Sequence, residues 1–109
     1  MLLHTGRSIP RFDQRWDPYD EDVIWFAWDD ALDGASITAS TWVVPLGWTL
    51  ETAFQNQTVV SESGESFTAS NGARLSTTAE EGTHVIANRV TLSDGRELER
   101  SVRLLVEDL

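Results

Sequence analysis

The sequence of 109 residues contains no cysteine. A disulfide framework, a thiolate metal site and a cysteine nucleophile are therefore excluded, and the fold must be held together by its core alone. Long apolar runs are also missing. None approaches the roughly twenty residues that span a bilayer, and no signal-peptide stretch follows Met1. We therefore expect a protein that is made in the cytoplasm and kept there, or assembled there into something larger.

Lysine is absent as well, so the eight basic residues are all arginines, against 18 acidic residues and a net charge of -10. A charge of this sign and size repels phosphate backbones and anionic lipid headgroups. We therefore expect neither a nucleic acid nor a membrane as a partner.

Histidine is scarce, and the two present do not suggest catalysis. His4 lies near the N-terminus, where we expect it to be solvated, and His84 begins an alternating run, where a structural role at a sheet edge is favoured over a general base. No serine lies in a Gly-x-Ser-x-Gly elbow. The sequence therefore predicts no catalytic residue, no cofactor and no enzymatic activity.

Acidic residues are abundant in the first third of the chain, which raises the question of a calcium site. The cluster consists of Asp17, Asp20, Glu21, Asp22, Asp29, Asp30 and Asp33. The spacing of an EF-hand is absent, and aspartates also occupy turns because their side chains bond the local backbone. We favour a solvated or partner-facing acidic rim over a metal site.

Alternation of apolar and polar residues dominates the rest of the chain. Residues 83–92 and 97–106 alternate on either side of Asp94-Gly95, which predicts a β-hairpin. Turn signals at close intervals, one of them at Asn71-Gly72, divide the chain into about seven short strands. The pattern predicts an all-β, immunoglobulin-like β-sandwich, with an open barrel as the second choice. A bulge is expected near residues 38–40, because Ile37 and Trp42 have opposite parity.

The first 22 residues differ in composition from residues 23–109, for which we expect the sandwich domain. Prolines and alternating charges interrupt them, so residues 1–22 are expected to form an extended arm outside the sandwich. A solvated tail has little use for aromatic residues, so we expect the arm to dock either on its own domain or on a neighbouring subunit. We favour contact with another subunit or another protein. The predicted partner-binding residues are Arg7, Arg11, Phe12, Arg15, Trp16, Tyr19 and, outside the arm, Trp48 at a loop after Gly47. For Trp16 and Trp48, the alternative is that each covers an end of the sandwich.

Two other residue types have an expected place inside the domain. Trp42 and Trp25 are the candidates for the central core aromatic, with Thr41 and Val43 pointing to the opposite face from Trp42. Asn88 lies mid-strand on an apolar face, and we expect it to be a buried polar group that bonds a neighbouring loop.

Three segments carry a resemblance to a known family: Val23–Trp25, Ala31–Gly47 and Ala87–Ser101. The second contains L-x-G-x-x-I-x-x-S-x-W-x-V-P-x-G, and the third contains N-x-(V/I)-T-x-x-x-G-(R/K)-x-x-x-R-S. Together they resemble the small virion proteins of tailed phages known as phage fiber-tail adaptors, over most of residues 23–106. The resemblance implies a small immunoglobulin-like accessory protein of a phage particle without enzymatic activity.

We therefore expect a virion structural protein, made in the host cytoplasm, that acts through protein–protein contacts as a capsid decoration or cement protein, or as a head–neck or fiber-tail adaptor. Its expected partners are other virion proteins of the capsid, neck, tail or fibre, and several copies or a homo-oligomer are expected in each particle. The alternative is a carbohydrate- or cell-surface-binding module, in which exposed tryptophans would stack on sugars.

Overall fold

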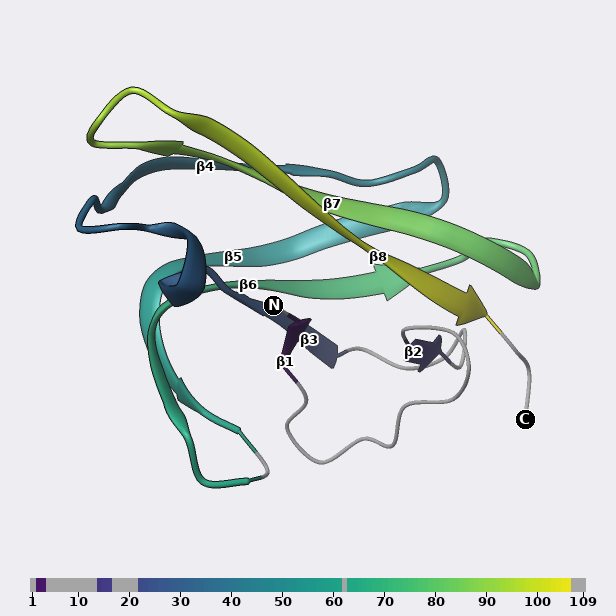
Figure 1. Cartoon of the computed structure of the whole chain (residues 1–109). Helices are drawn as coiled ribbons and strands as arrows, with labels where there is room; N and C mark the ends of the chain where they lie inside the picture. The colour runs from purple at the N-terminus through teal and green to yellow at the C-terminus, as the bar shows by residue number, and fades with distance from the viewer. Residues whose placement is uncertain (1, 4–13, 17–21, 62, 107–109) are drawn as a thin grey trace.

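A computed structural model of the chain describes residues 2–3, 14–16, 22–61 and 63–106. They form eight strands and one 3-10 turn but no α-helix, so the predicted all-β class is confirmed (Figure 1). The elements are β1 (Leu2–Leu3), β2 (Gln14–Trp16), β3 (Asp22–Ala27), η1 (Asp29–Ala31), β4 (Ile37–Val43), β5 (Trp48–Val60), β6 (Ser66–Thr77), β7 (Gly82–Leu92) and β8 (Glu97–Val106). In the described part of the chain, no helix is long and apolar enough to cross a membrane.

The strands form two sheets that pack face to face as a sandwich. Sheet A has the order β1-β3-β6-β5, and sheet B has the order β2-β8-β7-β4. All pairings are antiparallel except that of β2 with β8, which is parallel. Figure 1 shows sheet B above sheet A, with the β5–β6 hairpin bending away at its far end.

The core between the sheets follows from the period of two in each strand. The side chains on the inner face alternate with those on the outer face, and burying each large apolar one contributes about 1.5–3 kcal/mol. The large, almost fully buried side chains are those of Ile24, Phe26, Trp28, Leu75, Ile86, Leu92, Val102, Leu104 and Val106. They come from both sheets, so neither sheet is stable without the other.

The predicted hairpin of residues 83–92 with 97–106 and the predicted bulge near residues 38–40 are both confirmed. Strands β7 and β8 pair along their length up to Thr91 and Glu97, and Gly95 at the turn has a φ of 91°. The pairing of β4 with β7 shifts register between Ile37 and Ala39, which is the expected bulge.

The turn predicted at Asn71-Gly72 is wrong, because both residues lie in the middle of the continuous strand β6. The glycine is used for close packing instead. A Cβ atom at Gly72 would lie 2.7 Å from ring carbons of Trp25, so only glycine lets the indole lie across the strand. The Asn71 side chain is buried and hydrogen-bonded.

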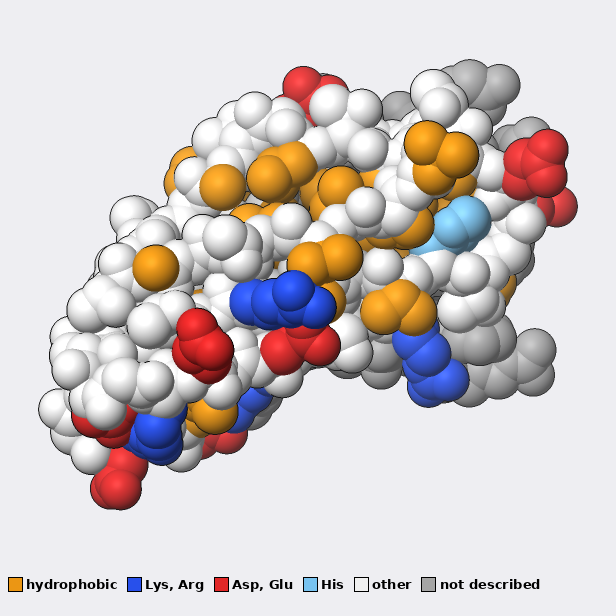
Figure 2. Space-filling model, turned by 90° about the horizontal axis from the view of Figure 1, so that it is seen from above, with side chains coloured by type: hydrophobic (Ala, Val, Ile, Leu, Met, Phe, Trp, Pro, Cys, Tyr) orange, Lys and Arg blue, Asp and Glu red, His pale blue; other side chains and the backbone are white. Residues whose placement is uncertain are grey.

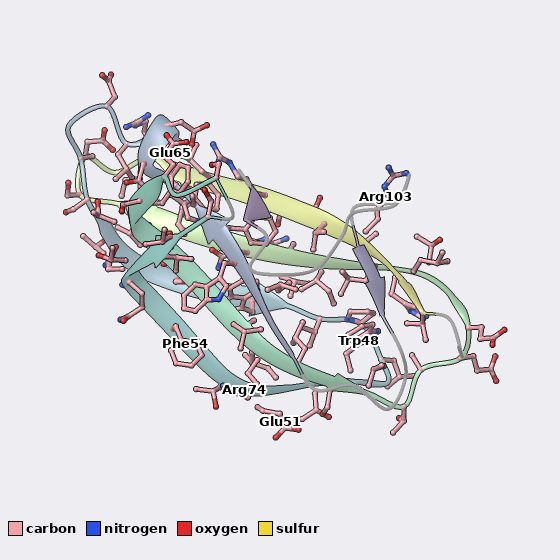
Figure 3. The ribbon with its side chains drawn as sticks, turned by 90° about the horizontal axis from the view of Figure 1, so that it is seen from below. Trp48, Glu51, Phe54, Glu65, Arg74 and Arg103 are labelled. Atoms are coloured by element: carbon pink, nitrogen blue, oxygen red, sulfur yellow. The ribbon has the colours of Figure 1, made fainter. Side chains whose placement is uncertain are left out.

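The central tryptophan is Trp28, which is 1% exposed, and neither Trp25 nor Trp42 takes its place. The parity of β3 turns Ile24 and Phe26 inward, so Trp25 lies on the outer face of sheet A, 5.4 Å from the Phe54 ring. Figure 3 shows Phe54 projecting from β5 on this side. Trp42 faces the core as predicted but is only partly buried.

The prediction that residues 1–22 lie outside the sandwich is wrong for two pieces of the arm. Strand β1 pairs with β3, and strand β2 pairs with β8, so each extends one sheet by an edge strand. The physical reason is that the outer edges of β3 and β8 offer rows of backbone donors and acceptors that another strand can satisfy. Residues 4–13 and 17–21 of the arm lie outside the described residues.

Candidate protein-contact surface

Asn88, the first residue of the motif N-x-(V/I)-T-x-x-x-G-(R/K)-x-x-x-R-S, lies at the centre of a buried polar network. The Asn88 Oδ1 atom accepts hydrogen bonds from Trp28 Nε1 at 3.0 Å and from Asn71 Nδ2 at 3.0 Å. Its Nδ2 atom donates to Ser40 Oγ at 2.9 Å and to the Thr41 carbonyl at 3.0 Å. The predicted structural role of Asn88 is therefore confirmed, because it connects β4, β6 and β7 with the segment that follows β3.

The arginines of the same motif also hold the fold together. The Arg100 guanidinium lies 4.6 Å from the centre of the Trp28 ring and donates to the Ala27 carbonyl at 2.7 Å and to Asp30 Oδ1 at 2.9 Å. Burial lowers the pKa of Arg100 from its ordinary value. Arg96 donates to the Leu32 carbonyl at 2.6 Å and so ties the β7–β8 turn to the loop after η1. These motif residues serve the fold, and the contact surface must be sought elsewhere.

Part of the acidic cluster is structural in the same way. Asp29 accepts hydrogen bonds from the backbone N–H groups of Thr68 at 2.9 Å and Ala69 at 3.1 Å, and Asp30 pairs with Arg100. Within the described ranges, no three His, Asp or Glu side chains are grouped so that they could hold a metal ion. Asp17, Asp20 and Glu21 lie outside the described residues, and Asp22 begins β3.

His84 is placed as a structural residue. Its Nε2 atom lies 2.9 Å from the Glu80 carbonyl oxygen, and its ring lies 5.9 Å from that of Trp48. His4 is outside the described residues. The arrangement around His84 joins the β6–β7 loop to the end of the core.

Two exposed valines are neighbours at one end of the outer face of sheet B, and an exposed leucine follows in the loop between β4 and β5. Val43 is 44% exposed, Val85 is 51% exposed and Leu46 is 98% exposed. Val43 lies opposite Ala87 in the β4–β7 register, and Val85 is two residues from Ala87 on the same face, so the two valines are diagonal neighbours. We call Val43, Val85 and Leu46, which lies three residues after Val43 in the β4–β5 loop, the apolar patch. Arg103 of β8 lies opposite Val85 and borders the patch. Figure 2 looks onto this face and shows hydrophobic side chains distributed along it.

Leu46 is presented by a tightly bonded turn. The Trp48 N–H donates to the Pro45 carbonyl at 3.2 Å, and the Thr78 N–H donates to the Gly47 carbonyl at 2.8 Å. Gly47 has a φ of 92° and packs so closely that an added Cβ would lie 3.2 Å from Ala79. The leucine therefore extends into solvent from a fixed backbone, which lowers the entropy lost when a partner covers it.

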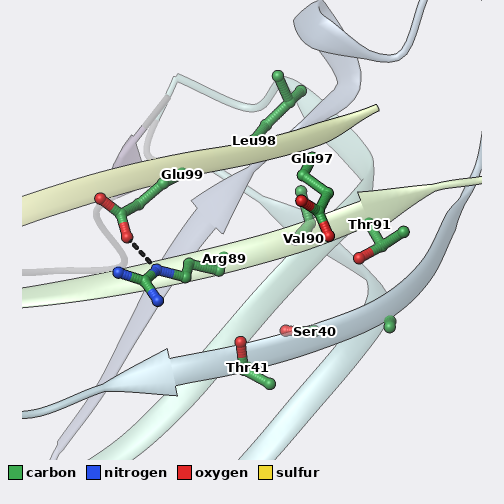
Figure 4. A pocket seen from close by; sticks show the side chains of 9 residues that line it. Ser40, Thr41, Arg89, Val90, Thr91, Glu97, Leu98 and Glu99 are labelled. Carbon is green, nitrogen blue, oxygen red and sulfur yellow. Dashed lines mark hydrogen bonds and ion pairs between the residues drawn. The ribbon is translucent and has the colours of Figure 1, made fainter. Parts of the chain in front are cut away.

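A shallow depression of about 570 Å³ continues the same face beyond the apolar patch (Figure 4). It is lined by Ala39, Ser40, Thr41, Arg89, Val90, Thr91, Glu97, Leu98 and Glu99. Arg89 Nε donates to Glu99 Oε1 on its floor, and this bond together with the charge of Glu99 raises the pKa of Arg89.

The partner-binding residues predicted from the sequence are not brought together in the described structure. Arg7, Arg11, Phe12 and Tyr19 lie outside the described residues, and their contact with a partner stays a prediction. Arg15 and Trp16 lie in β2, opposite Leu105 and Val106 of β8. Trp48 is 6% exposed and belongs to the core, so the structure favours the alternative of a structural role for Trp48 over partner binding (Figure 3).

The apolar patch was not predicted as a site, although the sequence contains part of its signal. Alternation placed Val43 and Val85 on outward faces of their strands. Only the β4–β7 register shows that the two faces are adjacent.

A family model described as podophage GP4 fiber-tail adaptor protein gp77 matches residues 17–105. No curated protein and no solved structure matches the chain. The matched residues include nearly all of the described sandwich, with both sequence motifs and the apolar patch.

Proposed function

The chain belongs to the podophage GP4 fiber-tail adaptor protein family, and from this premise we propose that it joins fibre and tail proteins of the virion through the outer face of sheet B. In this role it acts by protein–protein contact and catalyses no reaction. The family favours the adaptor over capsid decoration, cement or a head–neck role.

The apolar patch is the observation that supports this surface. Exposed apolar groups that lie together on a rigid face mark protein-binding surfaces more often than isolated ones do. Val43 and Val85 are held by the sheet, and Leu46 is held by the bonded turn, so little conformational entropy is lost on binding. The depression beside the patch provides shape for a complementary side chain.

The charge of the chain favours a partner with a basic rim. With 18 acidic and eight basic residues, most of the protein surface attracts cationic groups. On the outer face of sheet B, Glu97 and Glu99 stand at the depression together with Arg89, which pairs with Glu99, and Arg103 lies opposite Val85. Complementary charge around an apolar centre speeds association and fixes orientation.

The carbohydrate-binding alternative has less support. Such a module needs a tryptophan with an open ring face, whereas Trp28 and Trp48 are buried and Trp25 and Trp42 are partly buried. None of the tryptophans with described side chains offers an exposed platform.

The proposal is tested by placing a charge within the apolar patch. We expect Val85→Asp to reduce the number of adaptor copies retained on purified particles by about tenfold or more, because it desolvates a carboxylate in an apolar contact. The assay is complementation of a phage that lacks this gene, followed by quantitative mass spectrometry of the particles.

Val60→Asp is the matched control, since Val60 is 55% exposed at the end of β5, outside the patch. We expect it to leave copy number unchanged. Equal retention of both variants would contradict the proposed surface, and equal thermal stability of the two purified variants would show that folding is not the cause of a difference.

A further inference from the structure

Among the described residues, the outer edges of the two sheets differ in how they are protected from another strand. Strand β1 pairs with Trp25 and Phe26 of β3, and strand β2 pairs with residues 104–106 of β8. The rest of β8 carries the charged residues Glu97, Glu99, Arg100 and Arg103, and charged side chains also discourage the pairing of edges. The edge strand β5 shifts register at three places along its pairing with β6. Covering strands and bulges are the usual means by which proteins prevent one sheet from joining another.

Strand β4 is irregular only at its start, between Ile37 and Ala39, and it carries no charged residue. Its pairing with β7 is continuous from Ala39 to Val43, and in the described part of the chain it pairs on that side only. Its exposed side chains include Thr38, Thr41 and Val43, and the strand contains no proline. A regular edge of β-branched residues is suited to accept another strand.

The charge distribution points to the same edge. No charged residue occurs between Asp33 and Glu51, although the chain as a whole has a net charge of -10. Two copies of such an acidic protein repel each other over most approaches. An approach along the β4 edge brings together strands that carry no charge of their own.

We propose that β4 pairs antiparallel with β4 of a second copy, with the two-fold axis at Thr41. This register places Thr41 opposite its own counterpart and Ala39 of one copy opposite Val43 of the other, so a small side chain meets a larger one. A symmetric pair of this kind covers the β4 edges of both copies at once, whereas a strand from an unrelated protein would cover the edge of one copy only. Sheet B then continues from one copy into the next, and the inference does not depend on the proposed function.

The pairing is weak between free molecules. A single strand pair buries less surface than the roughly 1,600 Å² of a standard stable interface. Copies held next to each other in a particle have a high effective concentration, which makes a weak contact persistent. A monomer–dimer equilibrium is therefore expected for the purified chain, with dimers at high concentration.

The test is sedimentation equilibrium of the full chain over about 10 μM to about 1 mM, for the wild type and for Thr41→Lys and Thr41→Glu. Each variant alone places like charges on the two-fold axis, and we expect its dimerisation to weaken by about tenfold or more. An equimolar mixture of the two variants places opposite charges there, and we expect dimers to return to about the wild-type level.

Thr52→Lys is the matched control, because Thr52 is an exposed threonine of the other edge strand, β5, and it should dimerise as the wild type does. Circular dichroism and thermal unfolding establish that each variant is folded. A wild type that stays monomeric over the whole range overturns the proposal, as does a dimer that neither variant weakens. A mixture that does not restore dimers also overturns it. If the wild type is monomeric over the whole range but Thr41→Lys is no longer retained on particles, the β4 edge binds a strand of another protein instead of a second copy.

Discussion

Replacing Asn88 with leucine tests how much the buried polar network contributes to stability. Leucine keeps the number and branching of the side-chain heavy atoms of asparagine. It replaces the oxygen that accepts from Trp28 Nε1 and from Asn71, and the nitrogen that donates to Ser40 and Thr41, with methyl groups. Asn71 retains its bond to Ser40 Oγ at 3.2 Å, so the Trp28 N–H is the principal buried group that is left unsatisfied.

A buried polar group without a partner costs about 1–3 kcal/mol, and each lost bond to Ser40 or Thr41 adds up to about 1 kcal/mol. We therefore expect Asn88→Leu to lower the free energy of unfolding by about 2–4 kcal/mol. This is a large part of the roughly 5–15 kcal/mol that stabilises a typical domain. The measurement is urea unfolding followed by tryptophan fluorescence, with the slope checked for two-state behaviour.

A double-mutant cycle with Trp28→Phe isolates the central bond. Phenylalanine has no N–H group, so in that background Asn88→Leu should cost about 1–2 kcal/mol less. The exposed amide variant Gln55→Leu is the control and should stay within about 0.5 kcal/mol of the wild type. A cost below about 1 kcal/mol for Asn88→Leu, or strict additivity in the cycle, would refute the reasoning.

Three further variants test other contacts. In thermal unfolding, Gly72→Ala should destabilise the domain by about 1–3 kcal/mol, because the added Cβ meets the Trp25 ring. Combining it with Trp25→Ala should remove most of this penalty. An unchanged melting temperature for Gly72→Ala would contradict the close contact. Asp29→Ala should speed hydrogen exchange of the backbone amides at the start of β6, which lose their carboxylate acceptor, and unchanged exchange would contradict the contact. Hydrogen bonds from Arg96 lower the pKa of Asp94 below its ordinary value of 3.8, and the bond from the Arg96 backbone N–H has the largest effect. The ionised Asp94 carboxylate thus stabilises the fold above pH 3.8, and this stabilisation is lost as the pH falls through the lowered pKa. In unfolding curves measured from neutral to acidic pH, Asp94→Asn should abolish the part of the stability loss that comes from Asp94.

Local patterns in the sequence are sufficient for the β7–β8 hairpin, the bulge in β4 and the burial of Asn88. Each depends on alternation within one strand or on a turn of adjacent residues. Asn71-Gly72 has the same local signal as a turn, yet it serves close packing, because the decisive neighbour is Trp25 on another strand. Local chemistry does not contain that contact.

The choice of the central tryptophan fails for a related reason. The alternation of β3 places Trp25 on one face of the strand and Ile24 and Phe26 on the other. It does not indicate which of these two faces packs against the second sheet. The edge strands β1 and β2 are too short to show any period, and they form only because β3 and β8 leave edges open. The apolar patch likewise depends on the register between two strands, whereas the outward direction of each valine is visible in the sequence.

The order of strands in sheet B has a consequence for synthesis on the ribosome. Its two central strands are β8 and β7, which follow all the others along the chain, while β2 and β4 lie at the edges. While the nascent chain emerges, β4 has no strand to pair with until β7 is out, and β2 has none until β8 is out. Sheet A can pair β3, β5 and β6 earlier, but its inner face then remains uncovered. The domain is therefore expected to close late, after β8 has left the exit tunnel, and to fold slowly, because most of its pairings join distant residues.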